Sequence, residues 1–258
     1  MNAMPGETLL AINGLTIQFG GLVAVNNFSM ELREGRIAGI IGPNGAGKTT
    51  VFNAITGVYK PTAGEICFKA DTISGIAPYE ITRKGIARTF QNIRLFKGLN
   101  VLSNVMAAAG FRAQYGFFGG LLGLPGVWKH ERNIESEARK YLELVDLLDC
   151  QYLLPENLPY GLQRKLEIAR ALATKPGLIL LDEPAAGLNP NEVRELMELI
   201  RKIHHELGIT VLLIEHHMEM VMGICEELWV LNFGKMIAHG TPAEIQCNQE
   251  VLKAYLGD

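Results

Sequence analysis

Cysteine is scarce in this sequence and shows no metal-binding pattern. The four cysteines are widely separated along the 258 residues, without the short spacings that metal sites use. Isolated thiols of this kind suit a reducing cytoplasm. They are Cys67, Cys150, Cys225 and Cys247.

Long apolar runs and a large excess of one charge are also missing. No window of about eighteen residues is uninterruptedly apolar, so we expect no membrane-spanning segment. Residues 1–6 carry neither a basic start nor a long apolar core, unlike a signal peptide. The formal net charge of −3 gives no indication of general affinity for nucleic acids. With 48% hydrophobic and 20% charged residues, the composition suits one large globular domain, or one domain with a subdomain.

One stretch, residues 42–50, fits the phosphate-binding pattern G-x-x-x-x-G-K-[ST] between an apolar strand-like run and a predicted helix. Glycines let the backbone present N–H groups to an anion, and a helix start adds partial positive charge. We expect Lys48 to reach the outer phosphates of a nucleotide and the Thr49 hydroxyl to bind Mg²⁺. The alternative is a glycine-rich turn with a surface lysine. The expected nucleotide-binding residues are Gly42, Pro43, Asn44, Gly45, Ala46, Gly47, Lys48, Thr49 and Thr50.

Two adjacent carboxylates close the apolar run 178–181. An all-apolar strand is typical of a parallel sheet buried on both faces, and Asp182 and Glu183 emerge at its carboxyl end. Because adjacent residues of a strand point to opposite faces, the two acids have different roles. One can hold Mg²⁺ and the other can orient or polarise an attacking water. The alternative is a helix-capping aspartate beside a surface glutamate.

Three further residues lie at predicted strand ends. Gln91 can touch a metal ion or water there, although a surface glutamine is the commoner case. His216 follows the buried strand 209–214 and can donate a hydrogen bond to a terminal phosphate, although a lone histidine is usually structural or solvated. Phe19 lies beside the Gly20-Gly21 turn, where it either packs in the core or stacks on an adenine ring.

The order of predicted elements describes an α/β protein with two additions. Short strand pieces at 9–12 and 15–19, followed by loose apolar alternation, predict an antiparallel meander. From about residue 95 the pattern changes to helical spacing around a glycine-rich apolar stretch. We expect residues 1–94 and 161–258 to form the nucleotide-binding core with an antiparallel β subdomain, and residues 95–160 to form a helical subdomain.

The ordered set of motifs resembles the ATP-binding cassette (ABC) ATPases across nearly the whole chain. The matches are the Walker A loop at 42–49, the Q-loop Gln91, the Walker B strand and glutamate at 178–183, the D-loop at 186–189, the switch histidine His216 and the adenine-stacking Phe19. The resemblance implies an α/β P-loop NTPase (RecA-like) core with an antiparallel β subdomain and an inserted helical subdomain. It implies that Thr49, Gln91 and Asp182 surround Mg²⁺, that Glu183 polarises water, and that His216 steadies the γ-phosphate of ATP.

Several stretches are similar to one branch of that family, the cytoplasmic ATPase subunits of bacterial and archaeal branched-chain amino acid importers. They are 19–25, 88–91, 182–190 and 254–257, with a glycine-rich insertion near Phe117. The resemblance implies an ATPase that is peripheral on the cytoplasmic face of the membrane. Its implied partners are a second ABC ATPase subunit, permease subunits and, indirectly, a substrate-binding protein, without nucleic acid. The alternatives are the ATPases of urea or amide uptake, of lipopolysaccharide export, or a soluble iron–sulfur assembly factor.

Two positions depart from the motifs of the resembled family. The signature L-S-G-G-Q is replaced by Leu158-Pro159-Tyr160-Gly161-Leu162, and in this family the signature completes the ATP site of the opposing subunit. Proline has neither a hydroxyl nor an N–H, so only the Gly161 N–H and the helix start remain as donors. We expect the chain's own Walker site to be intact and the site that its signature completes to be weakened. His217 stands where the family usually has aspartate, and we expect little effect because His216 is present.

Overall fold

The computed structural model describes residues 6–112 and 125–256. Two compact units make up the chain: the first runs up to Arg88 and resumes at Gly177, and the second comprises Thr89–Pro176. The second unit includes more residues than the expected segment 95–160. The physical reason is that the long helix beginning at Tyr160 packs on the other helices of the second unit.

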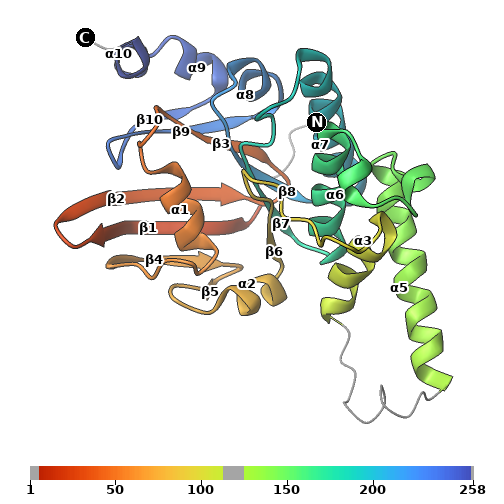
Figure 1. Ribbon diagram of the computed structural model, residues 1–258. Helices are drawn as coiled ribbons and strands as arrows, with labels where there is room; N and C mark the ends of the chain where they lie inside the picture. Colours follow the sequence, from red (N-terminus) through yellow and green to blue (C-terminus); the bar gives the residue numbers. More distant parts are fainter. Residues whose placement is uncertain (1–5, 113–124, 257–258) are drawn as a thin grey trace. The chain divides into compact units, whose positions relative to one another are not determined.

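The first unit contains a four-stranded antiparallel sheet in the order β2-β1-β4-β5 (Figure 1). Its strands are β1 (Thr8–Phe19), β2 (Leu22–Arg33), β4 (Ala63–Phe68) and β5 (Asp71–Thr72). The two strand pieces predicted at 9–12 and 15–19 form the single strand β1. Gly14, with a φ of 61°, lies at a register shift that absorbs the irregularity between the two pieces.

A six-stranded, mainly parallel sheet in the order β10-β9-β3-β8-β7-β6 completes the first unit. Its strands are β3 (Ile37–Ile41), β6 (Ile86–Arg88), β7 (Leu178–Asp182), β8 (Thr210–Ile214), β9 (Glu227–Asn232) and β10 (Lys235–Gly240). Every residue of β3, β7 and β8 is buried, as the all-apolar runs predicted. Only β10 runs antiparallel to its neighbour.

The first unit also contains helices, which lie between and after its strands along the chain. They are α1 (Lys48–Ile55), α2 (Pro78–Lys84), α7 (Pro190–Leu207), α8 (Met218–Ile224), α9 (Pro242–Gln246) and α10 (Gln249–Leu256). α7 begins with a capping box in which Asn189 and Glu192 satisfy each other's N–H groups. The buried apolar side chains of α1 share one hydrophobic core with residues of both sheets. This shared core fixes α1, and with it the glycine loop, in the first unit.

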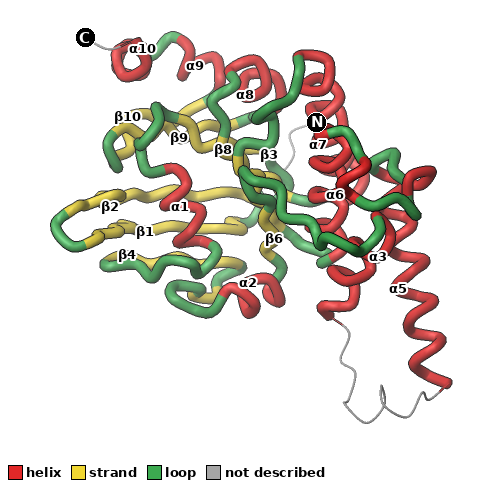
Figure 2. The backbone as a smooth tube through the Cα atoms, in the orientation of Figure 1, coloured by secondary structure: helices red, strands yellow, loops and turns green. Residues whose placement is uncertain are grey.

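The second unit is helical (Figure 2). Its described residues form α3 (Val101–Ala109), α5 (Pro125–Leu144) and α6 (Tyr160–Ala173), which pack on one another, and short 3-10 helices at Gly110–Arg112, Leu148–Cys150 and Pro155–Asn157. Asn100 caps α3 by accepting the N–H of Ser103 at 2.8 Å. The glycine-rich insertion near Phe117 lies outside the described residues. Within the described ranges, no helix is both long and apolar enough to cross a membrane.

Candidate functional site

Three parallel strands of the first unit end at one edge of the six-stranded sheet. β3, β8 and β7 are neighbours, and each is followed by residues that the sequence singled out: Gly42, His216 and Glu183. Parallel strands bring their carboxyl ends to the same edge, where open α/β sheets bind ligands. The fold therefore gathers the glycine loop, the acidic pair and the histidine at one edge.

The glycine loop occupies residues 42–47, and the first three residues of α1 complete the predicted stretch. The loop needs glycine, because φ is 147°, 80° and 103° at Gly42, Gly45 and Gly47. No side chain of the described residues caps the start of α1. Left-handed glycines before an uncapped helix start leave backbone N–H groups for an anion, so the loop fits a nucleotide phosphate.

Lys48 is buried at the start of α1, with 5% of its surface exposed. Its Nζ donates to the carbonyl oxygens of Gly42 at 2.7 Å and Pro43 at 2.9 Å. Burial lowers the pKa of the Lys48 ammonium, and the nearby carboxylates of Glu183 and Asp182 act in the opposite direction. The cation and both predicted acids thus lie within electrostatic reach of one another.

Asp182, the last residue of β7, forms a buried ion pair with Arg88, the last residue of β6. Arg88 Nη2 donates to Asp182 Oδ2 at 2.7 Å, and the two side chains are 6% and 5% exposed. Arg88 Nη1 donates to Asn53 Oδ1 at 2.7 Å and to Thr56 Oγ1 at 3.1 Å, both on or directly after α1. Arg88 therefore ties the end of β7 to the helix that follows the glycine loop. The sequence interpretation missed this residue, although a charge that ends a buried strand was a usable signal.

The Arg88 ion pair is expected to contribute to stability through its forked geometry. Arg88→Lys keeps the charge but cannot hold Asp182, Asn53 and Thr56 together, so the free energy of unfolding should fall by about 1–3 kcal/mol. Arg36→Lys is the matched control, because its ion pair with Glu226 is about two-fifths exposed and should change stability by less than about 1 kcal/mol. Urea denaturation of both variants gives the comparison. Equal losses of unfolding free energy in Arg88→Lys and Arg36→Lys would contradict a special role for the buried ion pair.

Oxygen donors suitable for Mg²⁺ are present beside the loop. Thr49 offers a hydroxyl and Asp182 a carboxylate, and Mg²⁺ prefers such hard oxygen ligands in small number together with substrate phosphates. The ion pair with Arg88 uses Oδ2 of Asp182, so Oδ1 is the oxygen of this carboxylate suited to a cation. The residues present therefore fit a magnesium ion bound with a nucleotide.

Glu183 and His216 face each other across the edge of the sheet. Glu183 Oε2 lies 3.7 Å from His216 Nδ1, and the two side chains are 15% and 55% exposed. Glu183 has a φ of 47°, a left-handed conformation that costs energy for a non-glycine residue and recurs at functional sites. The acid and the histidine can therefore both reach one water molecule or one phosphate oxygen.

Phe19 ends β1 as an exposed aromatic residue. Phe19 is 45% exposed. Its ring packs edge-on against the ring of Tyr59, with ring centroids 5.0 Å apart. Such exposure is not what packing in the core produces. Stacking of Phe19 on an adenine ring stays a prediction.

Gln91 and Gly161 both belong to the second unit. Arg164 of α6 donates from Nη1 to the Phe90 carbonyl at 2.7 Å and from Nη2 to the Gln91 carbonyl at 2.9 Å. It also pairs with Glu167 at 2.9 Å; burial raises the pKa of this carboxyl, and the Arg164 charge opposes that shift. Gly161 lies in the first turn of the same helix. A buried arginine of α6 thus fixes the backbone of the predicted Q-loop residue.

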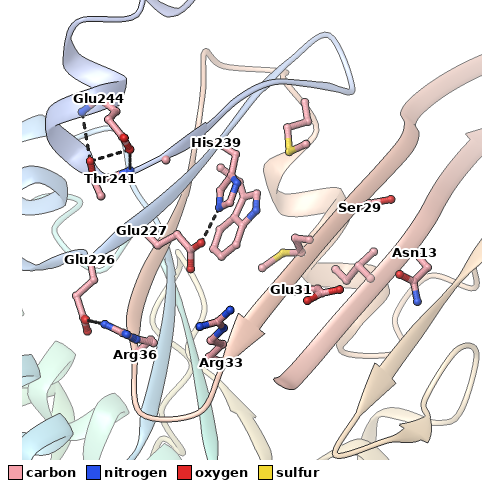
Figure 3. Close-up of a pocket in the computed structure, with 15 residues that line it drawn as sticks. Asn13, Ser29, Glu31, Arg33, Arg36, Glu226, Glu227, His239, Thr241 and Glu244 are labelled. Carbon is pink, nitrogen blue, oxygen red and sulfur yellow. Dashed lines mark hydrogen bonds and ion pairs between the residues drawn. The ribbon is translucent and has the colours of Figure 1, made fainter. Parts of the chain in front are cut away.

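A cavity of about 650 Å³ lies elsewhere in the first unit, lined by parts of β2, β9 and β10 (Figure 3). Trp229 stacks on His239 in its wall, with ring centroids 5.0 Å apart. His239 in turn pairs with Glu227 at 2.6 Å. None of the residues that line this cavity belongs to the predicted nucleotide site, so the cavity is separate from it.

Two family models match the chain. The model described as "ABC transporter" matches residues 25–186, which include the glycine loop and the acidic pair. The model described as "Branched-chain amino acid ATP-binding cassette transporter" matches residues 235–258, which include β10, α9 and α10.

Relatives and solved structures agree with these matches. The chain is 48% identical to the "High-affinity branched-chain amino acid transport ATP-binding protein LivG" of Salmonella typhimurium (strain LT2) over 252 residues, covering 98% of this chain and 99% of the relative. It is similar to the ADP conformation of MJ1267, an ATP-binding cassette of an ABC transporter, with a TM-score of 0.84 and 30% identity over 98% of this chain and 100% of that one. It is also similar to the dimeric post-hydrolysis structure of the ATP-binding cassette MJ0796 bound to ADP and Pi, with a TM-score of 0.76 and 26% identity over 91% and 99% of the two chains.

Proposed function

The chain belongs to the family of ABC transporter ATP-binding proteins, and from this membership we propose that it is the ATP-hydrolysing subunit of an importer for branched-chain amino acids. The observation that carries the proposal is the grouping of Lys48, Asp182, Glu183 and His216 at one sheet edge. The name of the LivG relative and the match at residues 235–258 support the substrate class.

Nucleotide binding is assigned to the glycine loop and its neighbours. An ammonium group has three N–H donors, and two of those on Lys48 bind loop carbonyls, which leaves one for a phosphate oxygen. Phe19 stacks on the adenine ring. Thr49, Asp182 and Gln91 are the proposed Mg²⁺ ligands, and the ion, when bound, neutralises charge on the β- and γ-phosphates.

Hydrolysis is assigned to the pair at the end of β7 and β8. The Glu183 carboxylate polarises a water molecule and accepts its proton as that water attacks the γ-phosphorus. The bond from the γ-phosphorus to the β–γ bridging oxygen breaks, and ADP leaves with the electron pair of that bond. His216 donates a hydrogen bond to a γ-phosphate oxygen and so holds the phosphate in line with the water. The separation of 3.7 Å between the two side chains supports this division of roles.

A second ABC ATPase subunit, either a copy or a homologue, is proposed to complete each site. The dimeric MJ0796 structure supports this arrangement by similarity. The signature segment offers the Gly161 N–H and the start of α6 to the partner's nucleotide. Pro159 precedes α6 with φ −51° and ψ 151° and supplies no side-chain cap. The site that this signature completes is therefore proposed to be the weaker one.

Pro159→Ser is expected to raise ATP turnover by restoring a hydroxyl donor at the signature. The same serine can cap α6 and stabilise the protein by about 0.5–2 kcal/mol, which is a separate effect. Pro159→Ala restores the N–H without the hydroxyl and serves as the control. Steady-state hydrolysis and urea denaturation measured on both variants separate the two effects. Unchanged turnover in Pro159→Ser would sink the weakened-signature hypothesis.

A permease contact is proposed for an apolar surface of the second unit. Five exposed large side chains lie on two segments that the Val101 N–H joins to the Leu153 carbonyl at 2.9 Å. They are Phe96, Leu99, Tyr152, Leu153 and Leu154. Exposed apolar residues grouped in this way mark interaction sites. Docking of a permease there places the subunit on the cytoplasmic face of the membrane as a peripheral protein.

Co-purification tests the transport assignment. The full chain should co-purify with a multi-span membrane protein, and the reconstituted complex should take up leucine, isoleucine or valine with ATP. Uptake of urea or an amide, or extraction of lipopolysaccharide, would instead favour the related ABC systems. Isolation with soluble iron–sulfur proteins alone would contradict the transporter assignment.

A further inference from the structure

A buried carboxylate that the sequence interpretation passed over lies between the acidic pair and the histidine. Glu215 directly follows β8, and its side chain has no exposed surface (0%). Its Oε1 accepts the N–H of Ala185 at 2.8 Å. Its Oε2 accepts the N–H of His216 at 3.0 Å and that of His217 at 3.1 Å.

These bonds satisfy the polar oxygens of the buried Glu215 side chain. A buried carboxylate is costly unless hydrogen bonds or a cation satisfy it. The His216 imidazole is close by, with its Nδ1 4.0 Å from Oε2 of Glu215. Backbone N–H groups therefore satisfy the Glu215 carboxylate in place of a cation. The carboxylate depends on these N–H groups keeping their positions.

The segments that Glu215 joins carry the proposed hydrolytic residues. Ala185 lies two residues after Glu183, and the Ala186 N–H bonds to the Glu183 carbonyl at 3.1 Å. On the other side, Glu215 holds the backbone N–H of His216 itself. One carboxylate thus links the backbone that follows Glu183 to the backbone that carries His216.

We propose that Glu215 is a positioning residue for ATP hydrolysis, setting the separation of Glu183 and His216 by binding both segments at once. This inference rests on the proposed function, because it assigns a task to Glu215 only if Glu183 and His216 act on ATP. Glu215 itself touches no substrate. Its effect is transmitted through the backbone at Ala185 and His216.

Glu215→Gln is the test. Glutamine has nearly the same size but one acceptor oxygen, so it must give up either the Ala185 bond or the two histidine bonds. We expect kcat for ATP hydrolysis to fall about 10- to 100-fold, while the Kd for ATP changes less than about twofold. Glu219→Gln, the same chemical change at an exposed position of α8, is the matched control and should leave both values unchanged. Unchanged kcat in Glu215→Gln would overturn the inference.

A double-mutant cycle distinguishes positioning from general destabilisation. If Glu215 acts through His216, Glu215→Gln should have little further effect on kcat in a His216→Ala background. The same fold-loss in both backgrounds would overturn the inference while leaving the proposed function intact. Absence of ATP hydrolysis by the wild-type protein in its complex would instead contradict the proposed function.

Hydrogen exchange of the nucleotide-free wild-type protein provides a readout independent of activity and of variant folding. The amides of Ala185, His216 and His217 should be protected, because each donates to a fully buried oxygen. In Glu215→Gln, at least one of the three should exchange about tenfold faster or more. Exchange of all three wild-type amides at the rate of exposed amides would overturn the inference.

Discussion

Replacing Glu183 by glutamine is expected to lower the rate of ATP hydrolysis by about two to four orders of magnitude, the range that a general base contributes. The amide keeps the shape of the side chain but cannot accept a proton from water. ATP binding should persist, because the loop and Lys48 are untouched and one negative charge near the phosphates is removed. The variant should also dimerise in ATP. Single-turnover hydrolysis and equilibrium nucleotide binding measure the two effects separately.

The His216→Ala variant supplies the comparison for Glu183→Gln. Loss of the proposed hydrogen bond from His216 should weaken hydrolysis, but Glu183, the proposed base, stays in place. In the parent structure its Oε2 lies 3.7 Å from Nδ1 of His216. A hydrolysis rate in Glu183→Gln equal to that of the parent would remove Glu183 from the role of base. Loss of ATP binding in Glu183→Gln would point instead to damage of the loop.

Replacing Gly42 by alanine is expected to destabilise the protein and to disable the glycine loop. A Cβ at this position would lie 2.0 Å from the carbonyl oxygen of Leu231, which is backbone and cannot rotate away. The φ of 147° adds strain for any side chain. Overpacking costs about 1–3 kcal/mol, and a left-handed backbone about 1–2 kcal/mol, so the free energy of unfolding should fall by about 2–5 kcal/mol. ATP binding should be lost, because the loop must move to relieve the contact.

Gly45→Ala is the matched control in the same loop. Gly45 also has a positive φ, 80°, but a Cβ there meets nothing within 4 Å. Only the backbone strain applies, so the loss of stability should be about 1–2 kcal/mol. Urea denaturation and ATP binding are compared for the two variants. Equal behaviour of Gly42→Ala and Gly45→Ala would show that the contact with Leu231 is not what restricts the loop.

Local patterns predicted the glycine loop and the strands that lead to the site. Lys48, Thr49 and the glycines lie in one short contiguous stretch, so their spacing in the sequence determines how they are arranged in space. Strands β3, β7 and β8 were recognised because burial on both faces demands uninterrupted apolar residues. The α/β class and the ABC family followed from the order of these local features and were confirmed by the comparisons.

Residues whose partners are distant in sequence could not be predicted in the same way. Arg88 binds Asp182, 94 residues further along the chain, and Glu215 binds the N–H of Ala185, 30 residues earlier. A lone arginine or glutamate beside a strand gives no sign of such a partner until the strand order is known. The range of residues in the helical unit differs from the expected range for the same reason. The contacts of α6 with α3 and α5 are evident only in the folded structure.

The position of β3 in the middle of its sheet has a consequence for synthesis of the protein. β3 pairs with β8 on one side and with β9 on the other. The strand that leads into the glycine loop can therefore pair only after the segments that begin at Thr210 and Glu227 have been synthesised. Domains emerge from the ribosome N-terminal end first, and contacts between such distant segments form slowly. The apolar strand Ile37–Ile41 is then a surface that chaperones or other chains can bind during elongation. A nascent chain interrupted before β8 carries the whole phosphate-binding motif, and yet it lacks both of the strands that pair with β3.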